Sequence, residues 1–105
     1  MNGNKLFLDT NAFIYFFEGR QKVTDLVIAT PSIYFSVISE IELLSFENLD
    51  KNTELQIKTF LSGCQKVFLR QNIVNRSISL KKEYKLKVPD AIIAASALEL
   101  DTPLI

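Results

Sequence analysis

The stretch that decides the fold is KLFLDTN at residues 5–11. Its first four residues have the apolar character of a short buried strand, and the strand stops at an acidic residue, Asp9. Open α/β sheets place their ligand crevice at the carboxyl ends of the strands, so Asp9 is expected at such a crevice. Thr10 and Asn11 follow as polar side chains that can cap the next helix or hold a water. The function then depends on which other residues converge on Asp9.

The rest of the chain alternates between segments typical of strands and segments typical of helices. Strands are expected at residues 5–8, 32–38, 66–69 and 102–105. Helices are expected at residues 11–18, 23–29, 53–61, 71–84 and 88–100, and another is expected to begin at Ser39. The segment 53–61 also permits a strand, because its apolar residues partly alternate. The alternation predicts an α/β fold around a parallel sheet of about four strands.

Composition and charge restrict the kind of protein. A chain of 105 residues with 48% hydrophobic residues is expected to form one domain, 1–105, with a real core. The formal net charge of +0 means that any nucleic-acid surface would be a local patch. The single cysteine, Cys64, excludes an intramolecular disulfide and fits a reducing compartment. The sequence shows neither a leader nor an apolar run near the roughly 20 residues of a membrane span, so a cytoplasmic protein is expected.

The chain contains no histidine. This excludes Ser-His-Asp and Cys-His catalysis, histidine acid–base pairs and histidine-based zinc sites. Carboxylates dominate the chemistry that remains, and oxygen-rich sites suit hard cations such as Mg²⁺ or Mn²⁺.

Three acids lie at the expected junctions between a strand and a helix. Asp9 follows the first strand, Glu42 lies early in the helix after the second, and Asp90 begins the helix at VPDA. Because these junctions share one edge of a parallel sheet, the three carboxylates are expected to meet. Unpaired, they would repel one another, and a divalent cation would relieve that repulsion. Such a cation could activate water and stabilise a leaving oxygen, which is sufficient to cut a phosphodiester.

Each acid also has a purely structural interpretation, and the sequence leaves both open. Glu42 completes a Ser-x-x-Glu capping box that begins at Ser39. Asp90 could simply favour the positive end of its helix, and Asp9 could be a helix cap.

The segment 66–87 carries seven Lys or Arg residues against one acid. Such a segment could contact phosphates, although a solvated helix face explains any single lysine at least as well. The candidates for RNA contact are Arg70, Arg76, Lys81 and Lys82. Within the helix 71–84, Val74, Ile78, Leu80 and Tyr84 are expected to face the core, Tyr84 rather than being stacked on a base.

Aromatic residues crowd the helix at 11–18, at Phe13, Tyr15, Phe16 and Phe17. They are more numerous than one inward face needs, so some are expected to be exposed and available to a partner or a second copy.

Three segments resemble the successive signature blocks of PIN-domain ribonucleases: LFLDTNAFIYFFEG, FSVISEIELLSF and VPDAIIAASALELDTPLI. The similarity is greatest to the toxins of bacterial type II toxin–antitoxin pairs, of the virulence-associated-protein C type. The blocks come in the family's order and cover essentially the whole chain.

The resemblance implies a PIN-like three-layer α/β/α fold and a Mg²⁺- or Mn²⁺-dependent RNA endonuclease. It implies that Asp9, Glu42 and Asp90 are the catalytic, metal-binding acids, and that Thr10 and Asn11 line the site. Glu42 rather than Glu40 matches the second acid, because the family places it directly before a leucine pair. The resemblance also implies a homodimer held inactive by an antitoxin protein.

Family members continue past TPLI with a threonine or serine, a fourth acid and a last strand, which this sequence lacks. The domain is therefore interpreted as truncated at its carboxyl end, and activity could be impaired. The alternative is an inactive module that still binds an antitoxin or dimerises. A phosphatase of the haloacid dehalogenase type or a receiver domain also places an aspartate after the first strand. The phosphatase pattern, however, wants an aspartate where this chain has Asn11, and receiver domains need an acidic pair and a late lysine that we do not find.

Overall fold

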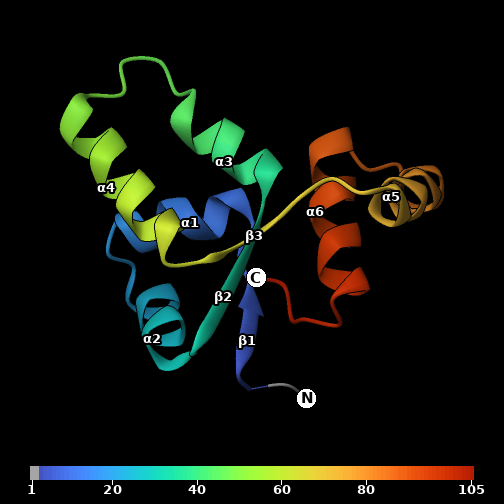
Figure 1. The fold of residues 1–105 in the computed structure, drawn as a ribbon, viewed down its shortest axis with the longest axis horizontal. Coiled ribbons are helices and arrows are strands. Elements are labelled where there is room, and N and C mark those ends of the chain that lie inside the picture. The colour runs from blue at the N-terminus through green and yellow to red at the C-terminus, as the bar shows by residue number, and fades with distance from the viewer. Residues whose placement is uncertain (1–2) are drawn as a thin grey trace.

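A parallel sheet with helices on both faces forms the centre of the molecule (Figure 1). The structure is a computed structural model that describes residues 3–105. Its strands are β1 (Lys5–Phe7), β2 (Ser32–Ser36) and β3 (Gln65–Val67), in the order β1-β2-β3. Both pairings are parallel, with Leu6 opposite Ile33 and Tyr34 opposite Gln65. The expected α/β fold with a parallel sheet is confirmed.

Six helices lie among the described residues: α1 (Thr10–Phe17), α2 (Gln21–Ala29), α3 (Val37–Leu44), α4 (Lys51–Ser62), α5 (Gln71–Tyr84) and α6 (Val88–Glu99). In Figure 1, α1 to α4 lie on one side of the strands, and α5 and α6 lie on the other. The fold therefore has the expected three layers, with the sheet in the middle.

The first strand divides the core between the two faces of the sheet. Leu6 and Leu8 belong to the cluster under α1, α2 and α4, whereas Phe7 packs against Ile93 and Ala97 of α6. This is the alternation that a strand imposes on successive side chains. A strand buried on both faces needs apolar residues at every position, which explains the continuous run at 6–8.

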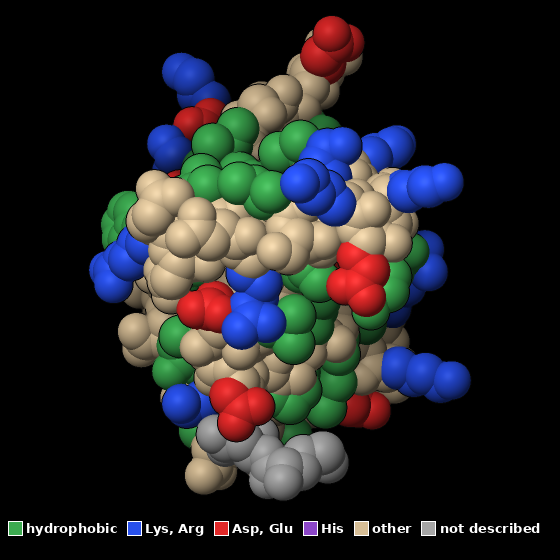
Figure 2. Space-filling model, turned by 90° about the vertical axis from the view of Figure 1, so that its right-hand side faces the viewer, with side chains coloured by type: hydrophobic (Ala, Val, Ile, Leu, Met, Phe, Trp, Pro, Cys, Tyr) green, Lys and Arg blue, Asp and Glu red, His purple; other side chains and the backbone are tan. Residues whose placement is uncertain are grey.

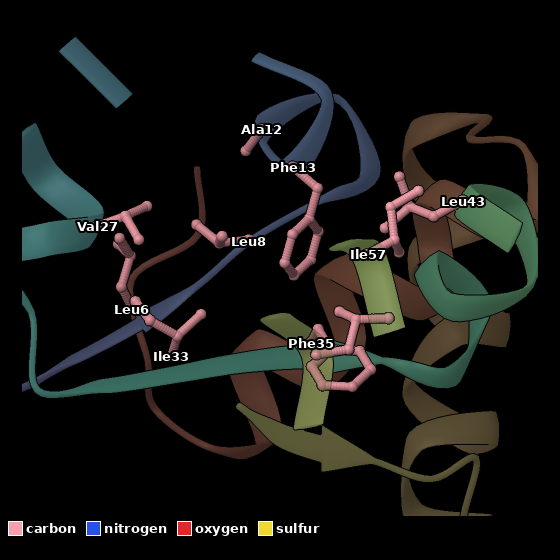
Figure 3. Packing of buried hydrophobic residues seen from close by; sticks show 10 residues of the cluster. Leu6, Leu8, Ala12, Phe13, Val27, Ile33, Phe35, Leu43 and Ile57 are labelled. Atoms are coloured by element: carbon pink, nitrogen blue, oxygen red, sulfur yellow. The ribbon is translucent and has the colours of Figure 1, made fainter. Parts of the chain in front are cut away.

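Phe13 is the aromatic centre of the larger cluster (Figure 3). It is fully buried and meets Phe35 and Phe60 edge-on, with ring centroids 5.9 and 6.1 Å apart. Figure 3 shows its ring pointing from α1 towards Phe35 on β2, with Leu43 and Ile57 beside it. As expected for so many aromatics in one helix, Tyr15 and Phe17 remain partly exposed.

The carboxyl-terminal segment pairs with the free side of β1. The amide of Phe7 donates to the carbonyl of Pro103 (2.7 Å), and the amide of Ile105 donates to that of Phe7 (3.0 Å). The strand predicted at 102–105 is reduced to a parallel bridge at Leu104, so three strands and a bridge replace the four predicted strands.

Two expected boundaries around α3 are wrong. The second strand ends at Ser36 rather than at residue 38, and α3 begins at Val37 rather than at Ser39. The reason is the cap: the Ser36 hydroxyl accepts a hydrogen bond from the amide of Ile38 (3.0 Å) and starts the helix early. Ser39 is therefore inside the helix, and the predicted capping box does not exist.

Two further expectations concern α4 and α5. The segment 53–61 lies entirely within a helix, so its strand alternative is wrong. The helix at 71–84 is confirmed, but its inward face is only partly as predicted: Ile73 and Ser77 are buried, Val74 and Leu80 are partly buried, and Ile78 and Tyr84 are exposed. The buried residues lie one position earlier along the helix than predicted. A polar residue was not expected in the core, but the hydroxyl of Ser77 can be buried because it donates to the carbonyl of Ile73 in its own helix.

No helix among residues 3–105 combines the length and the apolarity needed to cross a bilayer.

Candidate functional site

All three predicted acids line one cavity of about 260 Å³. The wall consists of Asp9, Thr10, Asn11, Ile14, Glu42, Phe46, Asp90 and Ile93. These residues come from α1, from α3 and the turn after it, and from α6, three segments far apart in the sequence. The structure therefore brings together every acid and both polar neighbours that were singled out from the sequence, as the parallel sheet requires.

Asp9 is held rigidly by its backbone and one side-chain oxygen. Its amide donates to the carbonyl of Ile105 (2.9 Å), and its carboxylate accepts from the amide of Ala12 (2.7 Å) as the cap of α1. The capping interpretation is thus correct, but it uses a single carboxylate oxygen. The other oxygen has no hydrogen bond in the part of the chain that the structure describes.

Glu42 does not have the structural role that the capping box offered. It lies in the second turn of α3, half-buried, and its carboxylate accepts a hydrogen bond from the hydroxyl of Thr10 (2.6 Å). The same hydroxyl oxygen lies 2.9 Å from the hydroxyl oxygen of Ser39. Thr10 at the start of α1 therefore holds the Glu42 side chain at the cavity, although the two residues are 32 positions apart in the sequence.

Asp90 is the third residue of α6, directly after Pro89. Proline at the start and an acid in the first turn are both favourable at a helix amino end, so the structural interpretation of Asp90 also holds. Its side chain is exposed at the cavity and forms no ion pair or side-chain hydrogen bond with another residue of the described range.

No Lys or Arg of residues 3–105 forms an ion pair with any of the three cavity acids; the ion pairs lie elsewhere, at Arg20–Glu18, Lys58–Glu54, Lys66–Glu40 and Arg76–Glu99. Carboxylates gathered on one cavity without a basic partner repel one another, and a cation is the simplest compensation.

The donor set fits a hard divalent cation. Carboxylate, hydroxyl and amide oxygens are ligands of Mg²⁺ and Mn²⁺, and Mg²⁺ commonly keeps several waters while using one or two carboxylates. In this structure, no three carboxylate or thiol groups of the described residues are close enough together to hold one ion directly. The arrangement therefore suits a hydrated ion better than one enclosed by three protein ligands.

None of the four predicted RNA contacts lines the acidic cavity. Arg76 forms an ion pair with Glu99 of α6, and this bond together with one from Asn72 lowers the pKa of Glu99. Lys81 lines an apolar groove between α5 and α6, and Arg70 lies beside Phe68 and the end of β3. Lys82 is exposed.

Figure 2 shows the face of the molecule covered by α5 and α6. Lys and Arg side chains project around its margin, with exposed hydrophobic side chains between them. The exposed apolar residues there include Leu69, Ile78 and Val88, which line the groove between the two helices.

Sequence reasoning missed four residues of the site. Ile14, Phe46 and Ile93 form the apolar part of the wall, and Ser39 lies behind it. A helical spacing of three residues places Ser39 on the same face as Glu42 and could have indicated its role, but the same spacing was interpreted as a capping box.

The fold and the site together define a class: a small parallel α/β domain with an acidic cavity at the carboxyl edge of its sheet. The sequence profile of the PIN domain matches residues 6–105, and the chain belongs to the PIN-domain family. The predicted membership of the PIN-domain family is thereby confirmed.

Several solved structures resemble the chain. A toxin–antitoxin complex from Klebsiella pneumoniae is 33% identical, with a TM-score of 0.83 over 94% of this chain and 82% of that one. VapBC2 from Rickettsia felis, bound to a promoter DNA fragment, has a TM-score of 0.79 at 19% identity, covering 95% and 84% of the two chains. VapBC-1 from nontypeable Haemophilus influenzae has a TM-score of 0.74 at 23% identity, covering 95% and 84%. The two less identical structures support the fold alone. No curated protein matches the sequence.

Proposed function

We propose that the chain is a divalent-metal-dependent RNA endonuclease, the toxin of a toxin–antitoxin pair. The observation that carries this proposal is that Asp9, Glu42 and Asp90 line one cavity and form no ion pair with a basic residue of the described range. Membership of the PIN-domain family and the likeness to a toxin–antitoxin complex support it.

Asp9, Glu42 and Asp90 would hold Mg²⁺ or Mn²⁺, with Thr10 and Asn11 beside them. When bound, such a cation supplies an activated nucleophile near neutral pH and stabilises the charge that develops on a leaving phosphate ester oxygen. The chain's own contribution is to fix the donors in place. Hydrogen bonds with Ala12 and Ile105 hold Asp9 in place, and a hydrogen bond from Thr10 holds Glu42.

Substrate binding requires a positive surface within reach of the cavity. Lys81, Lys82 and Arg70 remain the candidates for contact with RNA phosphates. Arg76 is the weakest of the original four, because its guanidinium already neutralises Glu99. The net charge of +0 makes a local contact of this kind necessary.

An antitoxin is the proposed protein partner, because the similar structure from Klebsiella pneumoniae, at 33% identity, is a toxin–antitoxin complex. Large apolar side chains exposed on α2, α3 and α4 offer a surface for it or for a second copy of the chain, namely Leu26, Ile28, Ile41 and Leu55. An inactive PIN module that only binds this partner is the second candidate, favoured by the same exposed residues.

Cleavage of structured RNA in Mn²⁺ separates the two candidates. The key variant is Asp9→Asn, because asparagine still caps a helix but removes the charge. Activity should fall by at least about a hundredfold, as expected when one electrostatic stabiliser is lost. Asp25→Asn, an exposed acid of α2 outside the cavity, is the matched control and should retain activity.

Equal cleavage by the wild type and Asp9→Asn would refute a nuclease that uses this cavity. No cleavage by the wild type, together with a stable complex with the antitoxin in sedimentation, would favour the binding module instead.

A further inference from the structure

Buried serines inside helices offer an internal comparison. Ser77 and Ser96 are buried in α5 and α6, and each hydroxyl donates to the carbonyl four residues earlier, at 2.6 and 2.7 Å. This is the local way for a helical serine to satisfy its hydroxyl. Ser39 is buried completely, yet its hydroxyl bonds Thr10, 29 residues away, instead of its own helix. The hydroxyl of Ser39 therefore has a tertiary contact that the other two lack.

Counting protons gives the direction of this contact. An ionised Glu42 only accepts hydrogen bonds, and the Thr10 hydroxyl has one proton. That proton is directed to Glu42, at 2.6 Å, so Thr10 cannot also donate to Ser39. Ser39 must be the donor in the 2.9 Å contact. The result is a one-way chain in which Ser39 donates to Thr10 and Thr10 donates to Glu42.

We infer that Ser39 is a positioning residue for Glu42, acting through Thr10. This inference rests on the proposed function, because it assigns Ser39 to the cation site of the same cavity. The bond from Ser39 fixes the rotation of the Thr10 hydroxyl, so the donor faces Glu42 before any cation arrives. The carboxylate then keeps one oxygen engaged and presents the other to the cavity.

This series of hydrogen bonds also assigns a role to Thr10. Because its only proton is committed to Glu42, Thr10 cannot donate to a substrate phosphate while Glu42 is ionised. It orients a proposed ligand rather than binding RNA. Partners that orient metal ligands in this way typically change cation affinity by about 10- to 100-fold when they are removed.

The experiment measures the affinity for Mn²⁺ from the concentration of free Mn²⁺, followed by electron paramagnetic resonance during a titration. This measurement does not depend on catalysis. Ser39→Ala should weaken binding by about threefold to tenfold, and Thr10→Val by about tenfold or more. Thr10→Ser keeps the hydroxyl and should restore most of the affinity. Ser96→Ala removes an equally buried helical hydroxyl that bonds only its own helix backbone, and it should leave the affinity unchanged.

A double-mutant cycle tests whether Ser39 acts through Thr10. In the Thr10→Val background, adding Ser39→Ala should change Mn²⁺ affinity by less than about twofold, because the intermediary is already gone. Undiminished affinity in folded Ser39→Ala, or an equal loss in both backgrounds, would overturn the inference. If Ser39→Ala does not fold, Thr10→Val and Thr10→Ser are compared instead. Equal Mn²⁺ affinity in these two variants would also overturn the inference.

The failure of this inference is distinguishable from the failure of the proposed function. A wild-type protein that binds no Mn²⁺ rejects both. A wild-type protein that binds Mn²⁺ and cleaves RNA, with Ser39→Ala identical to it, rejects only the role of Ser39.

Discussion

At the scale of single residues, the environment decides what each ionisable side chain does. Glu42 and Glu99 are both partly buried glutamates on helices. Glu99 is paired with Arg76 and Asn72, whereas Glu42 has a neutral hydroxyl as its partner and two other acids on the same cavity. A paired carboxylate stabilises the fold, and an unpaired one is available for a ligand.

The ion pair between Glu99 and Arg76 should make the stability of the fold depend on pH. The pKa of Glu99 is lowered in the folded state, first by the hydrogen bond from Arg76. Its contribution is therefore present above the ordinary pKa of 4.5 and is lost as the pH falls through the lower folded pKa. Glu99→Gln should lower the Tm at pH 7 by a small amount, and the difference should disappear near pH 3. Melting curves of both proteins across this range test it, and a difference independent of pH would contradict it.

Cys64 predicts slow thiol chemistry. Burial raises the pKa of this thiol to about 11 from the ordinary 9.0, so little thiolate exists at pH 8. Alkylation by iodoacetamide at pH 8 should be at least about tenfold slower in the folded protein than in urea, because the thiolate is the reactive form. Equal rates in the two states would show that the side chain is not protected.

At the scale of elements, helix ends set the geometry of the site. Asp9 starts α1, Ser36 starts α3, and Pro89 with Asp90 starts α6. Two of these helix starts, at Asp9 and Asp90, also line the cavity, so the same short segments both begin a helix and form the site. This is why a structural role and a functional role coexist at Asp9 and Asp90.

The end of α5 carries backbone strain that a substitution can relieve. Lys85 adopts the left-handed conformation, with φ 56° and ψ 38°, before the chain turns into α6. This conformation costs a non-glycine residue about 1–2 kcal/mol, partly offset by the entropy that glycine loses on folding. Lys85→Gly should therefore stabilise the protein by about 0.5–1 kcal/mol.

Urea denaturation of this variant measures the change. Lys87→Gly is the matched control, because Lys87 has an ordinary extended backbone at φ −69° and ψ 154°. It should destabilise by about 0.5–1 kcal/mol. A loss of stability in both variants would show that Lys85 is not strained.

At the scale of the whole molecule, the sheet brings acids from residues 9, 42 and 90 to one cavity, and hydrophobic clusters on both faces of β1 hold the sheet in place. Assembling like charges at one edge costs stability, and the packing on both faces of β1 offsets that cost. A ligand that neutralises the cavity should therefore stabilise the entire fold.

Mn²⁺ is expected to raise the Tm of the wild type. At a free concentration a hundred times Kd, a ligand that binds only the folded state contributes about 2.7 kcal/mol. In a domain of this size, this corresponds to roughly 10 °C or more. NaCl at equal ionic strength should have little effect, and Asp90→Asn should reduce the shift. An equal shift in wild type and Asp90→Asn would place the stabilising ion outside the cavity.

Local patterns explain what could be predicted from the sequence. The apolar run before Asp9 identifies a strand, since a segment buried on both faces needs apolar residues throughout. The helix at 71–84 and the junction positions of the three acids followed from equally local signals. Errors occurred where two local signals competed: Ser36 and Ser39 are both good caps, and the sequence cannot show which one the backbone uses.

The sequence alone determined most of the helices and strands, their order along the chain and the family to which the chain belongs, because periodicity, caps and motifs are properties of neighbouring residues. Only the tertiary structure decided that Ser39 is buried against Thr10, that Glu42 has no role in a cap, and that Arg76 is paired with Glu99. Those facts depend on contacts between segments about 20 to 30 residues apart, and the direction of a side chain across such a distance is set by packing rather than by local propensity.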